Sequence, residues 1–380
     1  MTTKTGATLL KIAAALALSA ASGSPSPARE LPAAAAASRS AIAARELMET
    51  LEGVGFSGGV LLARGDEVIL RKAYGSAFDA GGQRATTETV FDLGSITKQF
   101  TAASILLLEQ EGKLRTADPI GRYVDGLPAE KAALTLHQLL THTSGLGDAH
   151  GGDHEAVDKA EALKRIAAQK LRFPPGSSFS YSNSGYTLLA AVIERVSGMS
   201  YIDFVRRRLF VPAGMTSTGF YNEPLWSGRA VFHGYANGED TGDVARMPGP
   251  FWTVIGNGEA LSTLDDMRAW IRFLHGGKLL KASQLAKMTK GYVSRTSGGR
   301  WGYAMQMYDF PIGLALGHGG VGDGGNSEAY YVPQHDLVMV LHSNRTVMRE
   351  MKNPDGLVVQ LPARAARDAL AKVLAGTLKS

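Results

Sequence analysis

The residues with the clearest chemical potential stand in the stretch FDLGSITKQF, residues 91 to 100, where Lys98 follows Ser95 by three positions. Residues three apart on a helix share a face, so the amine can reach the hydroxyl. Gly94 removes a side chain directly before the serine, and a helix starting there presents unpaired N–H groups and a positive dipole end. The two residues can be a nucleophile with an activating amine, or ordinary residues that open a helix.

An amine that accepts a proton near neutral pH requires an unusual setting. The reference pKa of lysine is about 10.4, and a fall of about 3 corresponds to roughly 4 kcal/mol of differential interaction. Burial and neighbouring donors can supply a change of this size. A bare Ser-x-x-Lys motif leaves both interpretations open, because it is short and occurs often by chance.

A second pair with chemical potential is Tyr181 and Asn183, in a serine-rich segment before a predicted helix. Side chains two residues apart on an extended segment point the same way, so both can face one cleft. Tyr181 can take or relay a proton in the field of a nearby lysine ammonium. Asn183 can hydrogen-bond that lysine and a substrate carbonyl. The structural alternative is a turn tyrosine packed on the following helix.

A third feature is the run LGHGGVGDGG, in which His318, Gly319 and Gly320 end a predicted strand. Glycines let another backbone or a substrate approach an edge strand closely. The N–H of Val321 can then join that of Ser95 as an oxyanion hole, the donor pair for the negative oxygen of an acyl-transfer intermediate. The run does not fit a phosphate-binding loop, because no Gly-Lys-Ser or Gly-Lys-Thr follows it.

The remaining polar clusters point to structural roles. His142, in the loop at 139–147 that could wall the cleft, is expected to be a structural hydrogen-bonding residue. The stretch His150-Gly-Gly-Asp153-His154 supplies possible metal ligands, but its glycines indicate a mobile loop and no third ligand is evident from spacing. We therefore predict a solvated loop there, no metal site and no cofactor. Ser262 and Asp265 have the spacing of a capping box ahead of a helix.

Six segments in chain order resemble the serine β-lactamase and penicillin-binding superfamily, from about residue 57 to about residue 342. They most resemble its branch of class C β-lactamases, D-Ala-D-Ala carboxypeptidases and family VIII esterases. The segments are SITK, LLTHTSGL, PGSSFSYSNSGYTLLAAVIERVSG, LFVPAGM, GEALSTLDDMRAW and GHGG.

This resemblance implies a role for each residue of the three features. Ser95 would be the acylated nucleophile, Lys98 its activating partner and Tyr181 the general base and acid. Asn183 would position the substrate, and the backbone of Ser95 and Val321 would form the oxyanion hole. The complete set favours an enzyme over a penicillin-binding-like module that binds peptidoglycan or a partner without turnover.

The chain departs from the β-lactamase pattern at one place. Those enzymes carry Lys-Thr-Gly or Lys-Ser-Gly on the edge strand, whereas this chain has His318, Gly319 and Gly320. A histidine of pKa ~6.5 is mostly neutral at pH 7 and anchors an anion weakly. We therefore expect His318 and Gly320 to contact the substrate, and a serine hydrolase of esters or small amides and peptides. A class C-like β-lactamase or a D-Ala-D-Ala carboxypeptidase is the alternative.

The order of the helices and strands expected around these residues predicts an α+β fold. Residues 57–75 show a hairpin pattern, strand patterns return after residue 300, and an amphipathic helix closes the chain. Helical spacing dominates the region between, which implies one antiparallel sheet from both chain ends, flanked by helices, with a large inserted helical region. We expect a sheet lobe at about 41–94 and 295–380, a helical lobe at about 95–294, and the active site in the crevice between them.

The N-terminal residues show the basic-then-apolar order of a signal peptide, which we place at 1–23. A flexible lead-in is expected at 24–40, followed by a single catalytic domain at 41–380. Export to the periplasm or the medium follows from this interpretation.

Composition bounds the remaining possibilities. The 380 residues are 44% hydrophobic and 20% charged, with a net charge of +5 and scattered basic residues. The densest basic run, Arg206 to Arg208, has apolar neighbours typical of the solvated face of a helix, so we expect no nucleic-acid partner. The chain has no cysteine, which excludes disulfides and thiolate catalysis. We expect no membrane span, and a small ester, amide or D-amino-acid peptide as substrate.

Overall fold

A computed structural model of the chain describes residues 33–294, 299–322, 324–352 and 358–378. The signal peptide expected at 1–23 and the first part of the expected lead-in lie outside these residues. Helix α2 (Ala33–Gly53) begins inside that lead-in, so residues 33–40 are helical rather than flexible. The run of alanines explains this difference, because alanine has the highest helix propensity of all residues.

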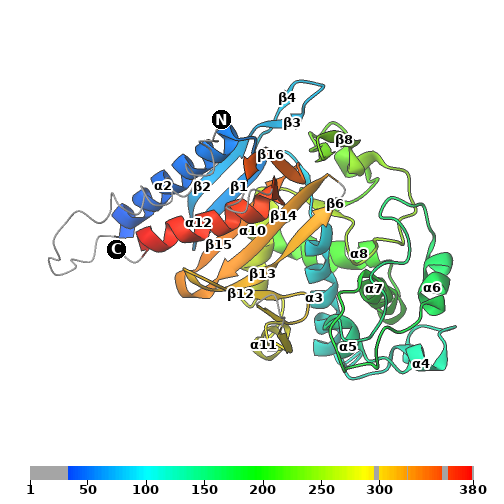
Figure 1. Cartoon of the computed structure of the whole chain (residues 1–380). Coiled ribbons are helices and arrows are strands. Elements are labelled where there is room, and N and C mark those ends of the chain that lie inside the picture. Colours follow the sequence, from blue (N-terminus) through cyan, green and yellow to red (C-terminus); the bar gives the residue numbers. More distant parts are fainter. Residues whose placement is uncertain (1–32, 295–298, 323, 353–357, 379–380) are drawn as a thin grey trace.

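One antiparallel sheet is built from both ends of the chain, as predicted, in the order β10-β11-β12-β13-β14-β15-β1-β2 (Figure 1). Strand β1 from the N-terminal part pairs along its whole length with β15 from the C-terminal part. The strands are β1 (Gly58–Arg64), β2 (Glu67–Tyr74), β10 (Val293–Ser294), β11 (Arg300–Trp301), β12 (Gln306–Phe310), β13 (Gly313–Gly322), β14 (Gly325–Val332) and β15 (Leu337–Ser343).

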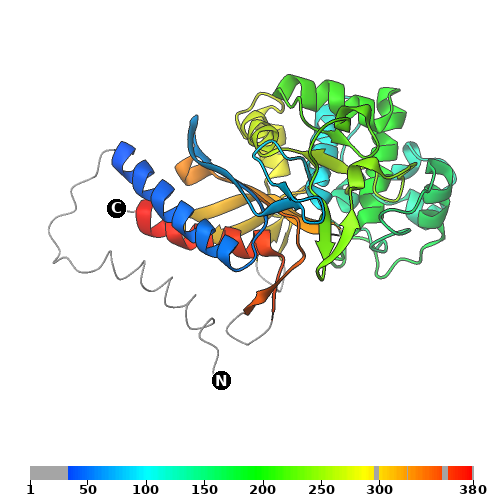
Figure 2. The same ribbon diagram turned by 90° about the horizontal axis from the view of Figure 1, so that it is seen from above.

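The central strands are buried on both faces, and β15 shows why. Its Met339 joins the core under helices α2 and α12 (Pro362–Leu378), whereas Val338 and Val340 join the core of the helical lobe. Successive side chains of a strand point to opposite faces, so a continuous apolar run can serve two cores at once. Figure 2 shows α2 and α12 together on one side of the sheet and the helical lobe on the other.

The helical lobe follows β5 (Phe91–Asp92) and contains the helices on which the predicted site residues lie. Helix α7 ends at Gly198 as expected, in the left-handed conformation that glycine favours (φ 71°). The helices of this lobe are α3 (Thr97–Gln110), α4 (Ala129–Ala132), α5 (Leu136–Leu140), α6 (Lys159–Ala168), α7 (Asn183–Ser197), α8 (Tyr201–Val205), α9 (Val211–Ala213), α10 (Leu264–His275) and α11 (Ala282–Met288).

The predicted cap of α10 was displaced by one residue. The Thr263 side chain, not that of Ser262, accepts a hydrogen bond from the backbone N–H of Asp266. The Ser262 hydroxyl is instead buried against Thr218, at 2.7 Å. Two hydroxyl residues in succession gave the sequence pattern two possible cap positions, and packing against Thr218 decided between them.

Several strands are too short to be predicted from alternating polar and apolar residues, and they connect further segments of the chain. Strands β5, β9 (Ala260–Ser262) and β6 (Gly219–Phe220) form a small sheet in which β9 is central. The N–H of Leu93 donates to the carbonyl of Ala260 at 2.9 Å, which brings the segment before Ser95 to the turn that precedes β9. The other short strands are β3 (Ser76–Phe78), β4 (Gln83–Arg84), β7 (Gly234–Ala236), β8 (Glu239–Gly242), β16 (Val347–Lys352) and β17 (Val358–Gln360).

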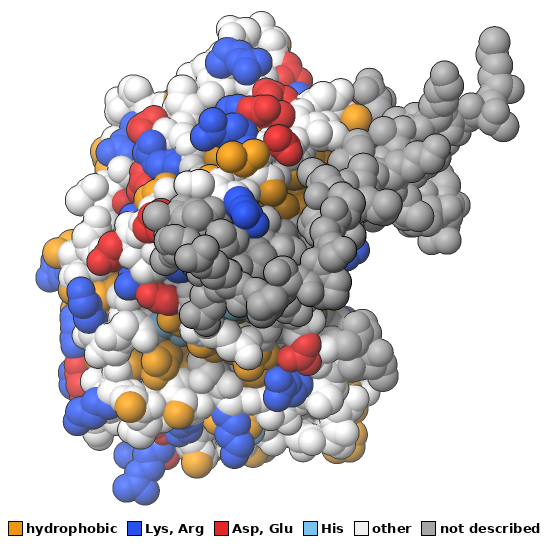
Figure 3. Space-filling model, turned by 90° about the vertical axis from the view of Figure 1, so that its left-hand side faces the viewer, with side chains coloured by type: hydrophobic (Ala, Val, Ile, Leu, Met, Phe, Trp, Pro, Cys, Tyr) orange, Lys and Arg blue, Asp and Glu red, His pale blue; other side chains and the backbone are white. Residues whose placement is uncertain are grey.

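Basic and acidic side chains are intermingled on the face of the molecule drawn in Figure 3. Within the Arg206–Arg208 run, Arg206 pairs with Glu223 and Arg208 with Glu111, which fits a solvated helix face better than a basic groove. Among the described residues, none of the helices has the length and apolar character needed to cross a membrane.

Candidate active site

Ser95 lies in a short 3₁₀ turn at Gly94–Ile96, directly in front of α3. Gly94 adopts a positive φ of 49°, and a side-chain carbon there would lie only 2.9 Å from the backbone nitrogen of Val321. The Asp92 carboxylate accepts a hydrogen bond from the Gly94 N–H at 2.9 Å. This turn therefore holds Ser95 against β13, and glycine is required for the close approach.

The Lys98 amine reaches the Ser95 hydroxyl, as their spacing predicted. The Lys98 ammonium donates to the Ser95 Oγ at 2.8 Å and to the backbone carbonyl of Asn257 at 2.8 Å. The Lys98 side chain is fully buried. One N–H is thus held by a fixed carbonyl, and the nitrogen is directed at the serine hydroxyl.

Burial lowers the pKa of Lys98 to about 7. The negative charges of Asp148 and Asp153 act in the opposite direction, because a nearby anion favours the ammonium form. The cost of removing the ammonium from water is the larger of the two effects. A substantial share of Lys98 is therefore a neutral amine at neutral pH, with a lone pair that can accept a proton.

Tyr181 packs beside the lysine. The Lys98 nitrogen lies 4.8 Å from the centroid of the Tyr181 ring, which stacks on His142 at 4.4 Å. The edge of this aromatic group is closed by Trp301, whose ring centroid is 5.6 Å from that of Tyr181. His142 accepts a hydrogen bond on Nδ1 from the Ser182 N–H at 3.0 Å, so it has the structural role predicted for it.

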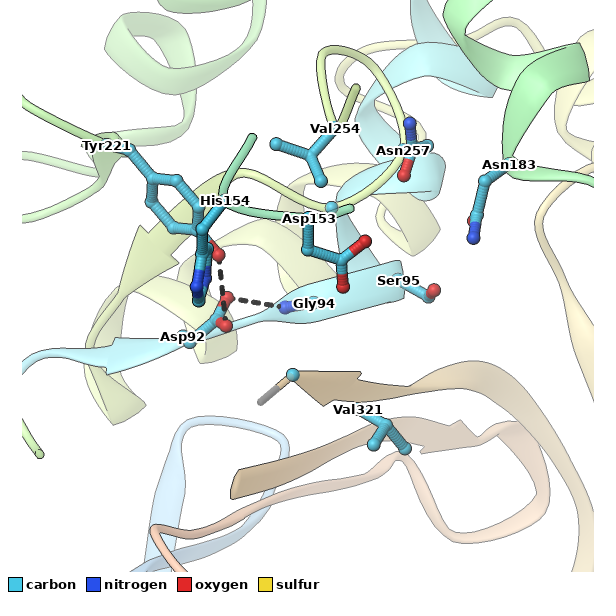
Figure 4. A pocket seen from close by; sticks show the side chains of 12 residues that line it. Asp92, Gly94, Ser95, Asp153, His154, Asn183, Tyr221, Val254, Asn257 and Val321 are labelled. Carbon is cyan, nitrogen blue, oxygen red and sulfur yellow. Dashed lines mark hydrogen bonds between the residues drawn. The ribbon is translucent and has the colours of Figure 1, made fainter. Parts of the chain in front are cut away.

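Asn183 is the first residue of α7, and its position is set by the backbone. Its N–H and that of Ser184 donate to the carbonyl of Asp148 at 2.7 and 3.0 Å. The Asn183 side chain lines the same pocket as Ser95 (Figure 4). Its Oδ1 is buried and has no hydrogen-bond partner, so an acceptor is available in the pocket.

Strand β13 meets the serine turn at its glycines. A methyl group on Gly320 would overlap the carbonyl oxygen of Leu93 and would lie 3.0 Å from the Ser95 nitrogen. The backbone amides of Ser95 and Val321 are therefore neighbours, as an oxyanion hole requires. Val321 lines the pocket, whereas Gly320, expected to contact the substrate, packs on Leu93 instead.

His318 does not lie where we expected it, in contact with a substrate in the pocket. It is 1% exposed and does not line the pocket. Burial, with a contribution from the Lys98 charge, lowers its pKa to about 3. Nδ1 bonds the Gly319 carbonyl at 2.6 Å, and since a carbonyl only accepts, the proton resides on Nδ1. Nε2 is then a buried acceptor without a partner, which is unsuited to a carboxylate.

The pocket beside Ser95 is formed by segments far apart in the chain (Figure 4). Sequence reasoning identified three of its residues, Ser95, Asn183 and Val321, and missed its acidic and aromatic wall. The lining residues are Asp92, Gly94, Ser95, Asp153, His154, Asn183, Tyr221, Val254, Asn257, Gly258, Val321 and Gly322.

The loop at 150–154 is only partly the solvated loop that we expected, since Gly152 and Asp153 are exposed but His150 is buried. The His150 ring bonds the Trp252 carbonyl at 2.9 Å and the Ser184 hydroxyl at 3.2 Å. Asp153 and His154 follow in the chain and line the pocket. Nowhere in the described ranges do three or more acidic, histidine or cysteine residues form a potential metal site.

Glu259 lies in the family-like segment GEALSTLDDMRAW, but the sequence predicted no role for it. It is 1% exposed, and burial raises the pKa of its carboxyl group to about 8. One of its oxygens accepts from the Gly256 N–H at 3.3 Å, across the turn that presents the Asn257 carbonyl to Lys98. Glu259 thus supports the turn that anchors the lysine.

The chain belongs to the Beta-lactamase family, whose sequence model matches residues 43–361. This places it in the superfamily of serine β-lactamases and penicillin-binding proteins, as the motif resemblance predicted. Over 304 residues it is 32% identical to the penicillin-binding protein PbpX of Bacillus subtilis (strain 168), covering 79% of this chain and 73% of that protein.

Two further proteins extend the comparison. The chain is 37% identical over 198 residues to Penicillin-binding protein 4* of B. subtilis (strain 168), covering 50% of this chain and less than half, 44%, of that protein. The solved structure of D-amino acid amidase from Ochrobactrum anthropi SV3, complexed with L-phenylalanine amide, matches with a TM-score of 0.76 at 22% identity. That match covers 90% of this chain and 99% of the amidase, and it shows the shared fold.

Proposed function

We propose that this protein is a serine hydrolase that cleaves esters, small amides or short peptides through an acyl-enzyme on Ser95. The observation that carries the proposal is the 2.8 Å contact of Ser95 Oγ with a buried amine, Lys98, whose pKa is about 7. A nucleophile at hydrogen-bond distance from a base with a pKa near the working pH is what acyl transfer needs.

In the proposed acylation step, Ser95 Oγ attacks the substrate carbonyl carbon and its proton passes to the Lys98 amine. The carbonyl oxygen becomes an anion, for which the backbone N–H groups of Ser95 and Val321 are the donors. The bond to the leaving group then breaks, and the leaving group takes a proton through Tyr181. Water activated by Tyr181 hydrolyses the ester on Ser95, which restores the hydroxyl and releases the acid.

The residues that line the pocket favour ester and amide substrates over substrates whose carboxylate must be bound by a cationic side chain. Among the described residues that line it, none is lysine or arginine. The amidase with the same fold was solved in complex with an amino acid amide, and also with the free amino acid. A β-lactamase or D-Ala-D-Ala carboxypeptidase activity remains the alternative, favoured by the names of the penicillin-binding relatives.

The test compares the wild type with Ser95→Ala on a short-chain p-nitrophenyl ester, a cephalosporin and a D-Ala-D-Ala peptide. We expect ester hydrolysis and covalent labelling by a fluorophosphonate in the wild type, and loss of both in the variant, by about 10³-fold or more in rate. Ser283→Ala, on the exposed surface of α11, is the matched control and should behave as wild type. Full turnover by Ser95→Ala would refute the mechanism.

A further inference from the structure

We propose that the pocket beside Ser95 selects substrates whose acyl group carries a positive charge, such as the α-ammonium of an amino acid amide or ester, and that Asp153 is the residue that selects it. The inference rests on the proposed function, because it requires Ser95 to be the nucleophile. It specifies which member of the broad ester and amide class the site prefers.

The charge of the pocket is the first support. Asp92 and Asp153 both line it, and no lysine or arginine is found among its described lining residues. Asp92 accepts from the Gly94 N–H at 2.9 Å and from the Tyr221 hydroxyl at 3.1 Å, so it belongs to the frame of the serine turn. The His154 ring packs against that of Tyr221, at 6.2 Å between centroids, whereas the Asp153 carboxylate points toward the space in front of Ser95 (Figure 4).

The reach of the Asp153 charge is the second support. Asp153 is among the anions that hold up the pKa of Lys98, so its field extends to the atoms that react. An ammonium group bound between Asp153 and Ser95 lies in an attractive field, and a carboxylate there is repelled. The bound cation also offsets the effect of Asp153 on Lys98, which favours the neutral amine when the attack begins.

An unpaired polar atom in the pocket is a separate observation, and it calls for the same kind of ligand. Oδ1 of Asn183, which lines the pocket, is buried and lacks a hydrogen-bond partner. An amide oxygen is an acceptor, so a substrate satisfies it with an N–H group. A carboxylate has no N–H to give, whereas amide and ammonium groups do.

The experiment uses three p-nitroanilides of alanine, each in D and L form, at pH 7. One has a free α-ammonium, one a neutral N-acetyl group and one an N-succinyl group with a carboxylate. We expect kcat/KM to fall in that order, with a ratio of about 10 between the ammonium and acetyl substrates, as for a partly exposed ion pair.

Three variants test the assignment to Asp153. In Asp153→Asn the ammonium-to-acetyl ratio should fall to about 1, and in Asp153→Lys the succinyl substrate should overtake the ammonium substrate. Glu155→Gln is the matched control, since Glu155 lies on the same loop but pairs with Arg165 at 2.8 Å outside the pocket. It should keep the wild-type ratio.

The outcomes separate this inference from the proposed function. Ser95-dependent turnover without preference for the ammonium substrate, or with preference for the carboxylate, would overturn the inference and leave the function standing. An equal loss on all three substrates in Asp153→Asn would show a structural role and also overturn it. Absence of Ser95-dependent turnover on any ester or anilide would remove both.

Discussion

The two sides of Ser95 differ in burial and in charge. On one side, Lys98 and His318 are almost completely enclosed and Tyr181 lies among aromatic rings. On the other side, Asp92 and Asp153 line an open pocket. Burial alters proton affinity strongly, whereas exposed charges act weakly but directly on what binds. The enclosed side is therefore suited to chemistry and the open side to substrate selection.

Burial and nearby carboxylates have opposite effects on Lys98. Burial lowers its pKa, whereas the charges of Asp148 and, on the open side, Asp153 raise it, and the balance is a value of about 7. Burial without these charges would lower the pKa of Lys98 further. A site with more exposure would leave it protonated at pH 7.

Removal of the amine is the largest perturbation of the enclosed side. Lys98→Ala should lower kcat on a neutral ester by about 10³-fold while KM changes little, because Lys98 acts on the proton of Ser95 and not on substrate binding. Steady-state kinetics measures this. Lys131→Ala is a control, since Lys131 is also buried but pairs with Glu130 outside the pocket. An unchanged kcat in Lys98→Ala would assign the base elsewhere.

A smaller effect is expected when β13 is pushed away from the turn that carries Ser95. Gly320→Ala should force the Leu93 carbonyl away, at a cost of about 1–3 kcal/mol in the free energy of unfolding. It should also lower kcat by roughly 10²-fold, since one oxyanion donor is displaced. Urea denaturation and steady-state kinetics test both effects. Gly53→Ala, at the end of α2 with open space around it and without a positive φ, controls for loss of a glycine alone. Wild-type stability of Gly320→Ala would contradict the close approach.

The pH dependence of kcat/KM tests the balance between burial and negative charge that sets the pKa of Lys98, and the expected effect is the smallest of the three. We expect kcat/KM on a neutral ester to rise with pH and to level off above about 7, because the ammonium form of Lys98 cannot accept the serine proton. In Asp153→Asn the midpoint should fall by less than about one pH unit, since an anion that favours the ammonium is removed. A midpoint that rises in this variant would show that Asp153 does not act on Lys98 by charge.

Much of the fold was accessible from local pattern. The hairpin at 57–75, the strands after residue 300 and the closing helix α12 all follow from alternation or helical spacing over several residues. The two-residue strands such as β5 and β6 could not be predicted in this way, because a pattern of two residues has no period.

The site was accessible in part. The spacing of Ser95 and Lys98 is a property of one helix turn, so the sequence alone predicts their contact. Asp153 and Glu259 lie in stretches that the sequence analysis singled out, but no role near Lys98 was predicted for either, because folding alone brings these distant segments to the lysine.

By itself the sequence determined the order of helices and strands, the Ser-x-x-Lys turn and the glycines that allow β13 to approach it, since these depend on neighbours along the chain. Only the tertiary structure decided that Lys98 is enclosed, that His318 is a neutral acceptor and that Asp153 faces Ser95. Burial and charge proximity are properties of space, and they depend on segments that folding brings together from far apart.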